Sequence, residues 1–133
     1  MKVVFADSFY FVALINLNDQ HHKKTVAIHR RLRERLVTTD WVLIEVADAL
    51  AKGKARPYVA GLVHDLRQSA DCEVISFSED LFDKALNFYD QHRDKHWTLT
   101  DCASFVVMQE RGITEALTGD HHFEQAGFIP LLK

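Results

Sequence analysis

The sequence predicts an α/β fold in which a short, mainly parallel sheet is flanked by helices. Short runs rich in β-branched and aromatic residues alternate with longer segments of helical apolar spacing, a pattern typical of strand–helix–strand units. The strand-like runs cover 2–6, 37–39, 73–76 and 115–118. With 133 residues and 47% hydrophobic content, the chain has the size and apolar content of one domain with one core. We therefore expect a single domain over 1–133.

The helices are predicted from apolar spacing and from capping residues. They are expected at 9–17, 21–36, 41–53, 56–70, 80–93, 98–111 and 120–126. Asp40 is expected to cap the third of them, and Gly53 to follow its end. The segment from Cys102 to Met108 is apolar all round, which predicts a buried helix.

Composition limits the possible partners and location. A formal net charge of -3 argues against a protein that holds nucleic acid by bulk positive charge, so a polyanion would need a local basic patch or a metal ion. The apolar N-terminal run is interrupted by Asp7 and is too short to span a bilayer, so we expect a cytoplasmic protein without a membrane partner. Cys72 and Cys102 lack metal-binding spacing and are expected to be buried and reduced.

Four acids occupy positions where a carboxylate needs an explanation. Asp7 and Asp120 follow the first and last predicted strands, and ligands of open α/β sheets bind at the carboxyl ends of strands. Glu45 interrupts an otherwise apolar helix, where an unpaired carboxylate would be costly. Asp101 lies at the amino end of the predicted buried helix, where the helix dipole favours negative charge.

Three of these acids also have purely structural explanations. Asp7 would serve as a helix N-cap. The spacing from Thr98 to Asp101 is that of a capping box. Glu45 would lie on a solvated stripe that includes Asp48. The sequence leaves these alternatives open.

Convergence of the four acids would create a cation site. Carboxylates packed together repel one another and take up protons unless a cation neutralises them. Mg²⁺ or Mn²⁺ fits best, because hard cations prefer carboxylate oxygens. Such a centre can position and activate a water for phosphodiester hydrolysis. For His121 and His122, beside Asp120, the favoured interpretation is a surface role rather than substrate contact.

A basic and aromatic segment precedes Asp101. Arg93, Lys95, His96 and Trp97 combine charge with an aromatic ring, which would suit a single-stranded nucleic acid lying over the site. An ordinary solvated loop explains the same residues. The basic face of the 21–36 helix likewise allows either a phosphate-binding or a solvated role.

Three segments carry a resemblance to a known family. They are FADSFYFVALI at the start, IEVADAL in the middle and LTDCASFVVMQERGITEALTGDHHFEQAGF near the end. The chain resembles PIN domains, specifically the VapC-type toxins of bacterial and archaeal toxin–antitoxin pairs. The resemblance implies a three-layer α/β/α sandwich and an endoribonuclease that uses a metal-activated water. It also implies a homodimer and a cognate antitoxin.

The resemblance assigns roles to particular residues. Asp7, Glu45, Asp101 and Asp120 match the family's acids, which ligate one or two Mg²⁺ or Mn²⁺ ions. Thr118 matches the small hydroxyl residue before the last acid. Ser8 and Ser104 match positions whose side chains support the acids without binding the metal themselves.

Two other classes of function compete with a nuclease. A non-catalytic PIN-like module would bind RNA or protein without cleavage, although the presence of all the acids speaks against it. A phosphoacceptor domain would need paired acids after the first strand, where this chain offers only Asp7-Ser8-Phe9. Glycine-rich phosphate loops are absent from the sequence as well.

Overall fold

A five-stranded parallel sheet forms the centre of the molecule in the computed structural model, which describes residues 2–133. The strands are β1 (Val3–Ala6), β2 (Arg35–Thr39), β3 (Cys72–Ile75), β4 (Glu115–Leu117) and β5 (Ile129–Pro130). Their order is β3-β2-β1-β4-β5, and every pairing is parallel. The predicted parallel sheet is confirmed. Its edge strand β5 is only two residues long and was not predicted.

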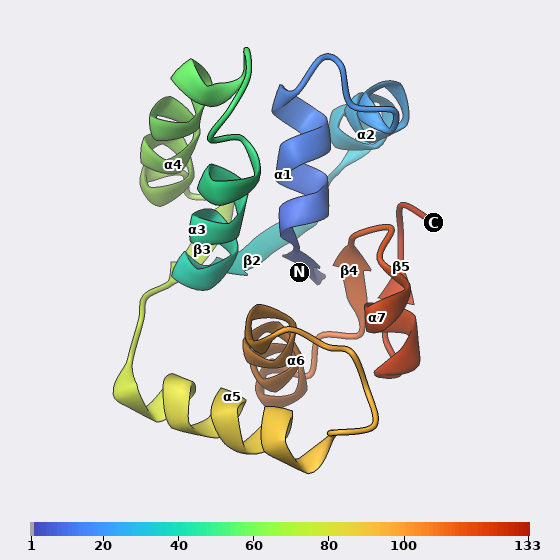
Figure 1. Ribbon diagram of the computed structural model, residues 1–133. Coiled ribbons are helices and arrows are strands. Elements are labelled where there is room, and N and C mark those ends of the chain that lie inside the picture. The colour runs from blue at the N-terminus through green and yellow to red at the C-terminus, as the bar shows by residue number, and fades with distance from the viewer. Residues whose placement is uncertain (1) are drawn as a thin grey trace.

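Helices cover both sides of this sheet. They are α1 (Ser8–Ile15), α2 (His22–Arg31), α3 (Asp40–Ala49), the 3₁₀ turn η1 (Arg56–Tyr58), α4 (Val59–Gln68), α5 (Glu79–Gln91), α6 (Leu99–Arg111) and α7 (His121–Gln125). Helices α1 and α2 lie on one side of the sheet, and α5 and α6 pack together on the other (Figure 1). The result is the predicted three-layer α/β/α sandwich.

The predicted helix over 21–36 is wrong in its last turn. Helix α2 ends at Arg31, Leu32 is extended, and β2 begins at Arg35. Leu36 pairs with Val4 on one side and with Cys72 on the other. The segment becomes a strand because its backbone completes two parallel ladders while its apolar side chains enter the core, a tertiary effect that outweighs local spacing.

The ends of α3 also differ from the prediction. Thr39, not Asp40, is the N-cap, and its hydroxyl accepts a hydrogen bond from the backbone N–H of Val42 at 3.1 Å. Asp40 is the first helical residue, and its carboxylate accepts a hydrogen bond from Arg67 at 2.7 Å. The helix stops at Ala49, so Gly53 does not follow its end.

Gly53 instead serves the turn that follows α3. Its φ of 124° lies in the region that favours glycine. Leu50 leaves the helix and buries its side chain, with 5% exposed, so packing ends α3 before the glycine is reached.

Helix α6 is buried as predicted. Every residue from Asp101 to Met108 is buried, and Phe105 meets Trp97 and Phe123 edge-on at ring-centroid distances of 5.1 and 5.0 Å. Cys102 and Cys72 are buried free thiols, as expected. This burial holds the amino end of α6 in the interior of the molecule.

The strand order places a crevice beside the central strand. From β1 the chain builds β2 and β3 on one side of it, then β4 and β5 on the other. In open α/β sheets the crevice outside the carboxyl ends of the strands at such a switch is the usual ligand site. The ends of β1 and β4 are therefore where a site is expected.

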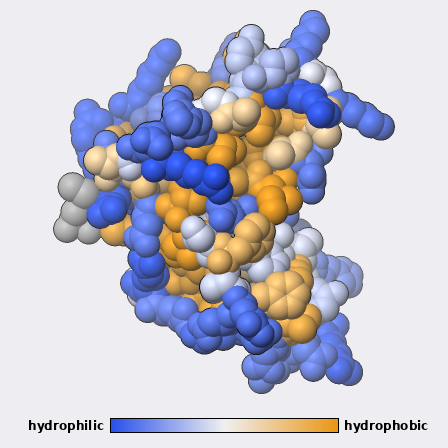
Figure 2. Space-filling model, turned by 90° about the vertical axis from the view of Figure 1, so that its left-hand side faces the viewer, coloured by the Kyte–Doolittle hydropathy of each residue, from blue (hydrophilic) through white to orange (hydrophobic). Residues whose placement is uncertain are grey.

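One side of the molecule carries an exposed apolar surface. Figure 2 shows hydrophobic residues gathered among hydrophilic ones on the side that carries α3 and the start of α5. Ile44, Phe77, Phe82 and Leu86 are each between 44% and 51% exposed. Across residues 2–133, no helix is long and apolar enough to cross a membrane.

Candidate active site

Five carboxylates line one cavity of about 380 Å³ at the carboxyl edge of the sheet, and four of them come from the segments that the sequence singled out. Asp7 follows β1 and Asp120 lies after β4, while Glu45 and Asp101 come from α3 and the first turn of α6. The structure thus brings together the four acids that the sequence singled out.

Asp7 is 4% exposed and faces the cavity instead of capping α1. It occupies the N-cap position, yet its side chain makes no capping hydrogen bond. Its carboxylate accepts a hydrogen bond from the Thr118 hydroxyl at 2.9 Å, and that hydroxyl accepts one from the backbone N–H of Asp120 at 3.1 Å. Thr118 therefore ties the two strand-end acids together.

Glu45 is half-buried and turned toward Ser8. The Ser8 hydroxyl donates a hydrogen bond to Oε1 of Glu45. Asp48, one turn on, is exposed. Glu45 is therefore separate from the solvated stripe, and Ser8 fixes its direction.

Asp101 serves two purposes at once. The predicted capping box is present: Thr98 Oγ1 accepts from the N–H of Asp101, and Asp101 Oδ2 accepts from the N–H of Thr98, each at 3.0 Å. The same side chain lines the cavity and is 7% exposed. Asp101 therefore closes the capping box and also lines the cavity.

Asp120 is the N-cap of α7, with its Oδ1 accepting from the N–H of His122 at 2.9 Å. His122 Nδ1 lies 3.0 Å from Asp101 and 3.6 Å from Asp120. Its side chain is 18% exposed, whereas that of His121 is 64% exposed. The expected surface role is therefore wrong for His122, because the α7 turn directs this ring between two acids. Its position two residues after the capping Asp120 was the available signal.

The tightest group of possible metal ligands in residues 2–133 is Asp120, His121 and His122, whose ligand atoms lie within 4.8 Å of one another. The carboxylate cavity is the better candidate for a metal site, because His121 is mostly exposed while the four acids line one cavity. His122 belongs to both groups. Among residues 2–133, its imidazole is the one side chain lining the carboxylate cavity that can carry a positive charge.

Other predicted residues lie farther from the acids. Ser104 is buried, and its hydroxyl donates to the carbonyl of Thr100 at 3.1 Å, within its own helix. Arg93, Lys95 and His96 lie in the α5–α6 loop and line a neighbouring cavity. Asp19, in the loop between α1 and α2, is the fifth carboxylate that lines the acidic cavity.

The electrostatics of the cavity disfavour its own negative charge. Burial raises the pKa of Asp7 to about 7, helped by Glu45 and Asp101 and opposed by the Thr118 hydrogen bond. Burial likewise raises the pKa values of Glu45 and Asp101, and neighbouring acids add to both shifts. A bound cation would reverse this balance by stabilising the charged carboxylates.

Comparison with known proteins places the chain in a family. The model for the PIN domain matches residues 4–129. The chain therefore belongs to the PIN-domain family, as its sequence resemblance predicted.

One relative is similar over nearly its whole length. The chain is 26% identical over 127 residues to the 23S rRNA-specific endonuclease VapC20 of Mycobacterium tuberculosis, covering 96% of both chains. The crystal structure of that VapC20, a sarcin-ricin loop cleaving toxin, superposes with a TM-score of 0.87 at 25% identity, over 96% of this chain and 98% of that one.

Two more distant structures share the fold. FitAcB of Neisseria gonorrhoeae gives a TM-score of 0.59 at 16% identity, over 96% of this chain and 94% of that one. VapBC2 of Rickettsia felis, bound to a DNA fragment from its promoter, gives 0.64 at 12% identity over 96% of each chain.

Proposed function

We propose that this chain is a divalent-metal-dependent endoribonuclease that acts as the toxin of a toxin–antitoxin pair. The observation that carries the proposal is the convergence of Asp7, Glu45, Asp101 and Asp120 on one cavity at the switch point of the sheet. The family membership and the VapC20 similarity support it. The proposal treats 1–133 as one domain.

The donor set fits a hard cation. The four acids offer carboxylate oxygens, the ligands that Mg²⁺ and Mn²⁺ prefer, and neither cysteine lines this cavity. Asp7, Glu45, Asp101 and Asp120 would hold the ion. When bound, Mg²⁺ or Mn²⁺ supplies a lowered pKa for water and neutralises charge on the scissile phosphate.

The remaining groups of the cavity orient these acids. Ser8 holds Glu45, and Thr118 holds Asp7 by donating a hydrogen bond. The backbone N–H of Thr98 holds Asp101. Because each acid is fixed by a hydrogen bond, little reorganisation is needed when a phosphate enters, which is the arrangement that favours catalysis.

The relatives support the choice of substrate and partner. VapC20 is a 23S rRNA-specific endonuclease, which makes ribosomal RNA the first substrate class to test. The similarity to a VapBC structure supports a cognate antitoxin. The exposed side chains of Ile44, Phe77, Phe82 and Leu86 support a homodimer that covers them. An enzyme with such a substrate would act in the cytoplasm.

The test compares the purified chain with its Asp101→Asn variant on total RNA and on intact ribosomes, with Mg²⁺ or Mn²⁺ and then with chelator. We expect discrete fragments that disappear with the variant and with chelator. Asp48→Asn is the matched control, because Asp48 lies on α3 near Glu45 but is exposed. It should cleave like the unmodified protein.

Two results would overturn the proposal. Cleavage by Asp101→Asn at the unmodified rate would remove the acids from the chemistry and indicate a contaminating nuclease. Binding of RNA by folded, metal-supplied protein without cleavage of any RNA tested would favour the non-catalytic binding module.

A further inference from the structure

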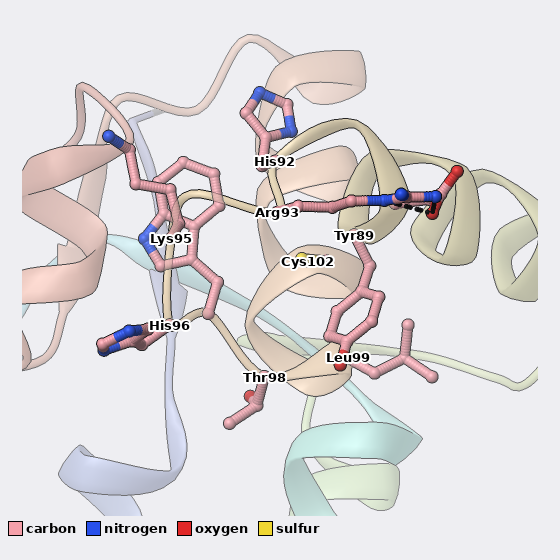
Figure 3. A pocket seen from close by; sticks show the side chains of 10 residues that line it. Tyr89, His92, Arg93, Lys95, His96, Thr98, Leu99 and Cys102 are labelled. Atoms are coloured by element: carbon pink, nitrogen blue, oxygen red, sulfur yellow. Dashed lines mark hydrogen bonds and ion pairs between the residues drawn. The ribbon is translucent and has the colours of Figure 1, made fainter.

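A second, larger cavity lies directly beside the acidic one. It has a volume of about 810 Å³ and is formed by the end of α5, the α5–α6 loop and the first turn of α6 (Figure 3). Thr98 lines both cavities, and its N–H holds Asp101. A nucleic-acid strand whose phosphate lies at the acids would therefore place a neighbouring nucleotide in this second cavity.

The back of this loop cavity is a fixed aromatic wall. Phe88 stacks with His92 and with Trp97, at ring-centroid distances of 4.3 and 5.9 Å. Trp97 is 6% exposed, and its Nε1 donates to Gln125 on α7 at 3.1 Å. Since α7 begins just after Asp120, the wall is held in a defined position relative to the acids.

Tyr89 is the exposed aromatic of the same cavity. Its side chain is 48% exposed, and Figure 3 shows it across the cavity from His96. The sequence gives no sign of this exposure, because the apolar spacing of the 80–93 helix places Tyr89 on the face predicted to be buried. An exposed aromatic ring beside a phosphodiester site offers a stacking surface for a base.

The charges of the loop do not form a phosphate clamp. Arg93 donates two hydrogen bonds to Asp90, at 2.7 and 3.0 Å. Lys95 pairs with Asp94 at 3.2 Å. Arg93 and Lys95 thus each have an adjacent acid that offsets their charge. Stacking therefore suits this cavity better than phosphate binding does.

We propose that the loop cavity holds one unstacked nucleobase of a single-stranded or looped RNA, with Tyr89 as its stacking surface. The volume of about 810 Å³ has room for a base together with its ribose, since pockets for whole drug-sized molecules measure roughly 300–1,000 Å³. The placement next to a scissile phosphate rests on the proposed nuclease function. The substrate class that follows is RNA with an accessible base beside the cut, not uninterrupted duplex.

The test measures binding apart from cleavage. Affinity for a labelled single-stranded oligoribonucleotide is measured by fluorescence anisotropy in an Asp101→Asn background with Mg²⁺, against the same strand in a perfect duplex. Tyr89→Ala should weaken single-strand binding about ten-fold or more, given the worth of one base–aromatic stack. Tyr89→Phe should stay within about two-fold, because the ring is retained.

Two controls separate stacking from other causes. Tyr58→Ala removes a tyrosine that is 66% exposed on η1 and lines neither cavity, so it should change affinity less than about two-fold. Binding is also measured for a set of strands that each lack one base. At one position, loss of the base should weaken binding by the protein that retains Tyr89 but not binding by Tyr89→Ala. That coupling identifies the stacked base.

The outcomes distinguish this inference from the proposed function. Equal affinity of Tyr89→Ala and its parent, or equal affinity for duplex and single strand, would overturn the inference even if RNA is cleaved. Tyr89-dependent binding by a protein that cleaves no RNA would uphold the base site and overturn the nuclease.

Discussion

Asp120 shows how one carboxylate combines a structural role with a proposed chemical one. It caps α7 through the N–H of His122 and also lines the acidic cavity. Asparagine caps helices about as well as aspartate does, but it lacks the negative charge that a cation needs. The two roles can therefore be separated by a single substitution.

For Asp120→Asn we expect cleavage to fall at least a hundred-fold, while the free energy of unfolding in chelator changes by no more than about 0.5 kcal/mol. Asp120→Ala is the companion variant and should lose about 1 kcal/mol as well, because the cap is gone. Cleavage rates and urea unfolding curves measure both effects. Retained cleavage by the asparagine variant would exclude Asp120 from the chemistry.

Asp7 makes the stability of the ion-free protein depend on pH. Its folded-state pKa of about 7 lies above the ordinary value of 3.8, so between these values the folded state holds a proton that the unfolded chain has lost. The stabilisation is complete below pH 4 and is lost as pH rises through 7. In chelator, this group therefore makes unfolding easier at pH 8 than at pH 5.

Asp7→Asn should flatten this pH dependence, because it removes the carboxyl group whose pKa burial raises to about 7. The measurement is the urea midpoint from pH 5 to pH 8 in chelator. Asp48→Asn should leave the slope unchanged. A slope that is identical in Asp7→Asn would show that Asp7 does not titrate in this window.

At the scale of elements, the β4–α7 connection shapes the floor of the cavity. Gly119 stands between Thr118 and Asp120, and a Cβ added there would lie 2.6 Å from Cζ of Phe9. Phe9 lines the acidic cavity and packs on His21 with ring centroids 4.8 Å apart. This close approach explains why residue 119 is glycine, although its φ is one that other residues adopt readily.

Gly119→Ala should displace the Phe9 ring into the cavity and lower cleavage about ten-fold or more, since small misplacements at a reacting centre are costly. Gly61→Ala is the matched control, because a Cβ on that α4 glycine meets nothing within 4 Å. The control should keep full activity and gain roughly 0.5–1 kcal/mol of stability. Equal cleavage by the two variants would show that Phe9 relaxes without effect.

Helices α6 and α2 show which elements could be predicted. The apolar run from Cys102 to Met108 and the capping box specify α6 locally. The helix therefore starts at the capping box, is buried, and ends at Arg111, as predicted. Residues 32–36 have helical spacing too, yet α2 ends at Arg31, and Arg35 and Leu36 join the sheet. Their fate depends on β1 and β3, which lie far away in the sequence.

At the scale of the whole molecule, a cation would stabilise the fold. A ligand that binds only the folded state at a hundred times its Kd adds about 2.7 kcal/mol. For a chain of this length that corresponds to a rise in Tm of roughly 10 °C. Thermal unfolding with and without excess Mn²⁺ at pH 7.5 tests this expectation.

The Asp120→Asn variant provides the control for that measurement and should lose most of the Tm rise. A shift of the same size in both proteins would indicate metal binding elsewhere, for example at exposed carboxylates. No shift in the unmodified protein at millimolar Mn²⁺ would contradict a cation site among the acids.

By itself, the sequence determined the α/β class, the buried helix α6, and Asp7, Glu45, Asp101 and Asp120 as the residues to examine. Those features depend on neighbouring residues, through periodicity, capping and the cost of a carboxylate in an apolar segment. Only the tertiary structure decided that the acids meet, that His122 lies among them, and that Tyr89 is exposed beside Thr98. These facts depend on how strands and helices distant in the sequence pack together, which local patterns do not encode.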